Sequence, residues 1–113
     1  MARLIVEAAS EDTIAGPGNQ EANYVILSVA KGSGAPVTGL TTANIDVEAL
    51  VVGPGGALVD VANVTGAGGF PGFYFVDIVP TTGQTWKSGT YIFAVVVKNG
   101  SDKGQTLASV LMD

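Results

Sequence analysis

Residues 86–98 (WKSGTYIFAVVVK) constrain the fold more than any other part of the chain, because their alternating positions are apolar on both sides. One set of side chains consists of Tyr91, Phe93, Val95 and Val97. The other set consists of Ile92, Ala94 and Val96. A strand with two apolar faces belongs in the middle of a sheet and is covered on at least one side. We therefore expect residues 89–98 to form a central strand, entered through a turn that contains Trp86.

The rest of the chain is divided into short segments by clusters of glycine and proline, of which it has 16 and 5. No segment shows a sustained helical period with caps. The pattern predicts β-strands at residues 2–8, 22–31, 44–52, 57–64, 73–79, 89–98 and 104–112. Short strands with such punctuation indicate one all-β domain over residues 1–113, an antiparallel seven-stranded Greek-key β-sandwich. A small closed barrel is the alternative.

Three connections carry turn or loop signals. The Gly-Pro-Gly-Gly run at residues 53–56 predicts a turn that returns 57–64 as the hairpin partner of 44–52. Asn99-Gly100 predicts a type I′ turn between the last two strands. Residues 32–43, rich in Gly and Pro, are interpreted as a crossing loop.

Two sets of residues resemble a known group of domains. Gly-Ala-Pro-Val-Thr-Gly-Leu at 34–40 resembles the G-x-P-V-x-G-L segment of bacterial immunoglobulin-like and prealbumin-like (carboxypeptidase-regulatory-like) β-sandwich domains. Pro-Gly-Phe-Tyr at 71–74 and Ser-Gly-Thr-Tyr at 88–91 are similar to their G-x-Y strand openings. The sequence departs from antibody-type domains, because it has no cysteine and no Trp in 44–52. The resemblance implies an adhesion, spacer or assembly module without catalytic residues, at the cell surface or within an assembly.

Charge and hydropathy exclude several classes of partner. The net charge is −5, and the five bases are scattered along the sequence, which argues against nucleic acid. The longest uncharged apolar segment, 92–97, is far shorter than the ~20 residues of a membrane helix, so we expect no membrane span. The apolar stretch within residues 1–7 is too short, and is interrupted by charge too early, to be the hydrophobic region of a signal peptide. The compartment therefore stays open: either the protein remains inside the cell, or an export signal lies outside this sequence.

The sequence contains few residues that could act in catalysis or bind a metal ion. Without His or Cys the chain has no Ser-His-Asp or Cys-His nucleophile set, no disulfide and no ordinary zinc site, and we expect no cofactor. The glycines of 66–72 miss the dinucleotide-binding spacing and are interpreted as a link between strands. The candidates for paired glycosidase carboxylates or a calcium site are Asp46, Glu48, Asp60 and Asp77, and their favoured interpretation is ordinary solvated strand residues. The glycosylation sequons at Asn63 and Asn99 are interpreted as coincidence.

Two aromatic residues flank the start of the central strand. Trp86 is expected to cap one end of the core. The alternative is that it stacks on a sugar ring, with Gln84, Thr85 and Lys87 as polar neighbours. Tyr91 lies where a tyrosine corner would be, and its hydroxyl is predicted to bond a backbone group within residues 80–88.

Alternation also leaves apolar side chains outside the sheets. If Tyr74, Val76 and Ile78 face the core, then Phe73 and Phe75 share the outer face with Asp77. The central strand similarly turns Ile92 and Val96 outward, unless the loops at 10–21 or 32–43 cover these faces. Charged residues make up only 13 % of the chain, against about 25 % in typical domains. We therefore expect a non-enzymatic structural or protein-interaction module, a homo-oligomer or part of an assembly; the alternative is a carbohydrate-binding or adhesion module using Trp86 and the loop ends.

Overall fold

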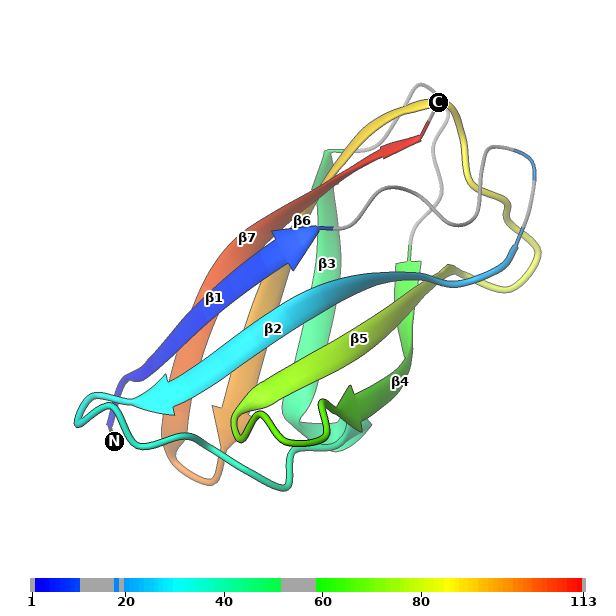
Figure 1. Cartoon of the computed structure of the whole chain (residues 1–113). Coiled ribbons are helices and arrows are strands. Elements are labelled where there is room, and N and C mark those ends of the chain that lie inside the picture. The colour runs from blue at the N-terminus through cyan, green and yellow to red at the C-terminus, as the bar shows by residue number, and fades with distance from the viewer. Residues whose placement is uncertain (1, 11–17, 19, 52–58, 113) are drawn as a thin grey trace.

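Two antiparallel β-sheets pack face to face in the computed structural model, which describes residues 2–10, 18, 20–51 and 59–112 (Figure 1). The strands within these residues are β1 (Leu4–Ser10), β2 (Asn23–Lys31), β3 (Ile45–Val51), β4 (Val59–Gly66), β5 (Phe73–Pro80), β6 (Gly89–Asn99) and β7 (Asp102–Met112). A single turn of 3₁₀ helix, η1 (Thr42–Asn44), precedes β3. The prediction of an all-β, antiparallel, sandwich-like fold is confirmed.

The strand order is β1-β2-β5-β4 in the larger sheet and β3-β6-β7 in the smaller. The strand β6 lies between β3 and β7, as its two apolar faces predicted. Tyr91, Phe93, Val95 and Val97 all point into the core and are fully buried. Across the core they meet side chains of the larger sheet, among them Val25, Leu27, Val29, Tyr74, Val76 and Ile78.

The predicted hairpin between residues 44–52 and 57–64 is wrong. The strand β3 pairs with β6, from Ile45 opposite Val97 to Val51 opposite Ile92, whereas β4 pairs with β5 in the other sheet. The chain therefore crosses between the sheets where a tight turn was expected; residues 52–58 lie outside the described residues. Glycine and proline in a sequence indicate a turn, but they do not specify which strand becomes the neighbour.

The turn between β6 and β7 is where the sequence predicted it, but its type differs. Asn99 pairs with Asp102, so Gly100 and Ser101 are the two central residues. Gly100 has φ +62°, and no residue other than glycine has a positive φ in the described part of the chain. A type I′ turn needs positive φ at both central positions, whereas type II′ needs it only at the first. The dihedrals therefore correspond to type II′, with glycine at the position that requires it.

The link from β2 to β3 crosses between the sheets, as predicted, and packs into one end of the core. Val37 and Leu40 are buried there. The Tyr74 hydroxyl donates to the Val37 carbonyl oxygen (2.6 Å) and accepts from the Leu40 N–H (3.4 Å). Gly72, with φ +85°, lies against this link: a Cβ there would be 2.9 Å from both Pro36 Cβ and the Val29 carbonyl oxygen. The link is thus fastened to one end of the core.

One edge of the sandwich is closed by β1 and β7, which lie side by side (Figure 1). Arg3 forms a parallel bridge with Lys103, and the Lys103 N–H donates to the Ala2 carbonyl oxygen (3.1 Å). Gly104 makes the approach possible, since a Cβ on it would be 2.5 Å from the Leu4 carbonyl oxygen. The two strands therefore meet through backbone contact at this residue.

Candidate interaction surface

The outer face of the larger sheet carries the two phenylalanines predicted to lie there. Phe73 and Phe75 alternate along β5 with the buried Tyr74, Val76 and Ile78, so the predicted register of this strand is correct. Their side chains are 42 % and 38 % exposed. No β-bulge interrupts β5 against β2; the register shift lies between Val61 and Asn63 of β4.

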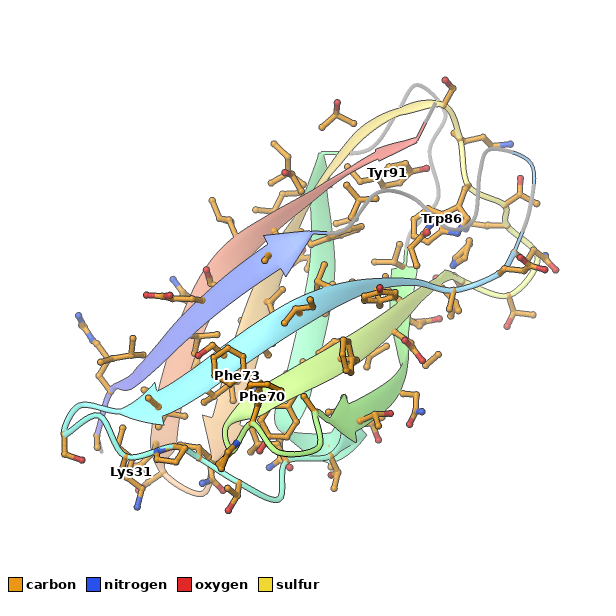
Figure 2. The ribbon with its side chains drawn as sticks, in the orientation of Figure 1. Lys31, Phe70, Phe73, Trp86 and Tyr91 are labelled. Atoms are coloured by element: carbon orange, nitrogen blue, oxygen red, sulfur yellow. The ribbon has the colours of Figure 1, made fainter. Side chains whose placement is uncertain are left out.

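Further apolar side chains extend this surface, and sequence reasoning missed them. Phe70, 65 % exposed, packs its ring edge-on against Phe73, with centroids 6.4 Å apart (Figure 2). Tyr24 of β2 packs edge-on against Phe75, with centroids 5.6 Å apart. Ile26, also on β2, lies directly opposite Phe75. We call this surface, consisting of Tyr24, Ile26, Phe70, Phe73 and Phe75, the aromatic face.

The sequence contains a signal for some of these additional residues and none for the others. Tyr24 and Ile26 alternate with Val25 and Leu27, which the sequence placed in the core, so period two alone puts them on the outer face. Phe70 gives no such signal, because it lies in the glycine-rich link before β5. Only the fold of that link, held by the hydrogen bonds from the Phe70 N–H to the Ala67 carbonyl and from the Phe73 N–H to the Phe70 carbonyl, brings it beside Phe73.

Polar residues border the aromatic face. Glu7 of β1 and Ser28 of β2 lie in register with Phe73 on one side. Thr65 of β4 lies opposite Phe75 on the other, and Asp77 lies opposite Tyr24. An apolar, aromatic centre surrounded by polar side chains is the usual composition of a protein–protein interface.

The second pair of predicted interface residues, Ile92 and Val96, lies on the opposite side of the molecule. Both are half-buried on the outer face of the smaller sheet. The more prominent side chains there are Leu50 and Leu107, 55 % and 62 % exposed. This face is interrupted by charge, since Asp46 and Glu48 project from β3, and Asp46 pairs with Lys98 at 3.1 Å. The apolar surface on this side is therefore smaller than the aromatic face, and its residues Leu50, Ile92, Val96 and Leu107 include no aromatic ring.

Trp86 is a core residue, which corrects the alternative of a sugar-stacking site. Its side chain is 1 % exposed, its indole N–H donates to the Glu21 carbonyl oxygen (2.8 Å), and its ring packs edge-on against Tyr91 with centroids 5.1 Å apart (Figure 2). Gln84 and Lys87 lie in the same link, with Lys87 exposed and Gln84 half-buried. The covered indole leaves no open face for a sugar ring in this arrangement.

Tyr91 makes the hydrogen bond expected of a tyrosine corner. Its hydroxyl oxygen accepts from the Lys87 backbone N–H at 2.9 Å, four residues upstream and within the predicted span. The ring is fully buried and stacks on Phe93, with centroids 6.0 Å apart. Tyr91 thereby fastens the link before β6 to the start of that strand.

Of the four carboxylates weighed as candidate sites, Asp46 and Asp60 line a common surface hollow of about 430 Å³ between β3 and β4. Asp46 and Glu48 lie on β3, whereas Asp60 and Asp77 lie on β4 and β5 of the other sheet. No group of three or more His, Cys, Asp or Glu side chains suited to a metal ion occurs in the described residues. Nor do those residues contain a helix long and apolar enough to cross a membrane.

Comparison of the chain with protein-family models, with curated proteins and with solved structures gave no match.

Proposed function

We propose that this chain is a non-enzymatic structural and protein-interaction module that associates with further copies of itself through the aromatic face. The observation that carries the proposal is the group of three exposed phenylalanines on and beside the outer face of β5: Phe70 packs against Phe73, and Phe75 packs against Tyr24. Soluble monomers seldom expose contiguous apolar surface of this kind. Aromatic residues are also the type most enriched where protein surfaces meet.

The fold of the proposed module is a seven-stranded, Greek-key β-sandwich of the immunoglobulin-like type. Strands 1, 2, 5 and 4 in one sheet and 3, 6 and 7 in the other are the arrangement of constant-type immunoglobulin domains. The tyrosine corner at Tyr91 lies at the start of the sixth strand, as in those domains. These two features support the immunoglobulin-like interpretation of the resemblance over the prealbumin-like one.

Association through a face is favoured over pairing of edge strands. Both strands on the open side of the sandwich, β3 and β4, carry register shifts, between Ala49 and Val51 and between Val61 and Asn63. Such irregularities oppose the addition of another strand. The molecule measures 42 × 27 × 20 Å, so its broad faces are large enough for the roughly 800 Å² per partner that a stable interface buries.

The test is sedimentation velocity on the wild type and on Phe75→Glu at tens of micromolar protein. We expect the wild type to associate and Phe75→Glu to weaken this association by about 2 kcal/mol or more, a roughly 30-fold higher dissociation constant, because a charge would be buried at the centre of the contact. Phe70→Glu, at the most exposed ring, should act in the same direction.

Leu107→Glu is the control, since Leu107 is an apolar residue on the other outer face with an exposure of 62 %, close to the 65 % of Phe70. It should leave the mass in solution unchanged, and Val96→Glu should do the same. A wild type that is monomeric in this range would refute the proposal. Association that Leu107→Glu abolishes and Phe75→Glu leaves intact would refute the assignment to the aromatic face. Circular dichroism on each variant verifies that it is folded.

A further inference from the structure

Four of the five basic residues, scattered in the sequence, form one row across an end of the folded molecule. Lys98 of β6 pairs with Lys103 of β7, and Lys103 forms a bridge with Arg3 at the start of β1. Lys31 of β2 pairs with Leu4, the residue after Arg3. All four side chains are exposed, at the end of the sandwich that Lys31 marks in Figure 2. We call these four residues the basic row.

The basic row places like charges next to each other. Neighbouring strands lie only about 5 Å apart, and like charges directly opposite each other across them destabilise a sheet. The row contains two such pairs, Lys98 with Lys103 and Lys103 with Arg3. A chain with 10 acidic and 5 basic residues has enough carboxylates to separate these cations. An anion from outside the molecule would relieve the repulsion.

Carboxylates of the molecule itself compensate only part of this charge. Lys98 forms an ion pair with Asp46, with the Nζ and Oδ2 atoms 3.1 Å apart. Among the described residues, no ion pair engages the other three members of the row, Arg3, Lys31 and Lys103. The uncompensated charge is therefore centred on the edge where β1 meets β7.

The other acids leave an excess of positive charge at this edge. Asp102 adjoins the row and accepts a hydrogen bond from the Ala2 N–H (3.0 Å). Glu7, further along β1, is four residues from Arg3, about 13 Å at the rise of a strand, whereas screening at about 0.1 M salt limits interactions to about 10 Å. Asp60 lines the hollow between β3 and β4, at the opposite edge of the two sheets. Three cations thus have one carboxylate beside them.

A surface hollow of about 520 Å³ opens at the same edge, between β1 and β7. Three of the side chains that line it, those of Arg3, Lys103 and Gln105, carry hydrogen-bond donors. A guanidinium donates two parallel hydrogen bonds to one carboxylate, and an ammonium group adds a point charge. The hollow therefore has the volume and the donors to hold a carboxylate side chain.

An acidic segment of a protein fits the basic row better than a nucleic acid does. The net charge of −5 repels a long chain of phosphates everywhere outside the row. The residues that line the hollow include no aromatic ring on which a base would stack. In an extended peptide, carboxylates two residues apart are separated by about 7 Å, which is close to the spacing of neighbouring strands. Successive carboxylates of such a segment can therefore meet successive cations of the row.

We propose that the basic row is a docking site for an acidic peptide segment of a partner protein. One carboxylate of the segment enters the hollow, where Arg3 and Lys103 bind it, and a further carboxylate meets Lys31. The contact uses none of the residues of the aromatic face. It therefore adds a second kind of partner to the self-association proposed above and does not depend on it.

Fluorescence anisotropy with a labelled hexaglutamate peptide tests this site. We expect binding at about 20 mM salt that is at least about tenfold weaker at about 300 mM, because salt screens the exposed charges. Lys103→Gln should raise the dissociation constant by about fivefold or more, since it removes a cation from the centre of the row. Arg3→Lys keeps the charge but loses the planar pair of donors, and it should raise the dissociation constant about threefold.

Lys87→Gln is the matched control, since it changes the net charge by the same amount and Lys87 is the one basic residue outside the row. It should bind hexaglutamate as the wild type does, with circular dichroism verifying that each variant is folded. No binding at low salt, or equal weakening by Lys103→Gln and Lys87→Gln, would overturn the proposal. Tighter binding of a single-stranded hexathymidylate would overturn the assignment to an acidic peptide. The aromatic face is judged separately, by its own variants.

Discussion

At the scale of single residues, buried tyrosine hydroxyls hold irregular links to the core. Tyr91 accepts from Lys87 in the link before β6, and Tyr74 bonds Val37 and Leu40 in the link before β3. Each ring is buried, so the polar group at its tip needs a partner. Backbone groups of the two links are these partners, and the hydrogen bonds hold the links in place without a disulfide.

Replacement of Tyr91 by Phe isolates one of these bonds. We expect Tyr91→Phe to lower the free energy of unfolding by roughly 1–2 kcal/mol, because the ring stays packed while the Lys87 N–H loses its acceptor. Tyr24→Phe is the matched control, since Tyr24 lies on the outer face, where its ring packs against Phe75. Chemical denaturation of both variants measures the difference; equal stability of Tyr91→Phe and wild type would mean that the bond contributes nothing.

At the scale of elements, the closure of one edge depends on how near β7 comes to β1. The nearest atoms to the position of a Cβ on Gly104 are the Leu4 carbonyl oxygen at 2.5 Å and Val6 Cγ2 at 2.7 Å. A backbone oxygen cannot move without its strand. The small residue is therefore required by the packing of two elements rather than by its own backbone angles.

Gly104→Ala should accordingly destabilise the domain by about 1–3 kcal/mol, as overpacking of a rigid contact does. Gly66→Ala, also within a strand but with no atom within 4 Å of its Cβ position, should leave stability nearly unchanged or raise it slightly. Thermal unfolding of the two variants makes the comparison. Similar melting temperatures for both would show that β1 and β7 are not in close contact.

At the scale of the whole molecule, the proposed contact through the aromatic face determines the shape of the assembly. Because the molecule measures 42 × 27 × 20 Å, contact through a broad face stacks two molecules across a short dimension. We expect small-angle scattering of the associated wild type to give a maximum dimension near that of one molecule. A particle about twice as long would contradict association through the aromatic face.

The alternation of apolar side chains determined much of this structure by itself. Strand positions, the core residues of β2, β5 and β6, and the outward direction of Phe73 and Phe75 all follow from period two, because a strand must present one face to the core. Gly100 indicated the position of the turn between β6 and β7. Each of these features is local, set by neighbouring residues along the chain.

Pairing between distant strands was decided only by the tertiary structure. The segment 57–64 has the pattern of a strand, but its place beside β5 rather than β3 depends on how the two sheets fill a common core. The same packing brings Phe70 against Phe73 and covers the indole of Trp86. It also gathers Arg3, Lys31, Lys98 and Lys103 from four strand ends into one charged surface, since residues far apart in sequence become neighbours only through the register of the sheets.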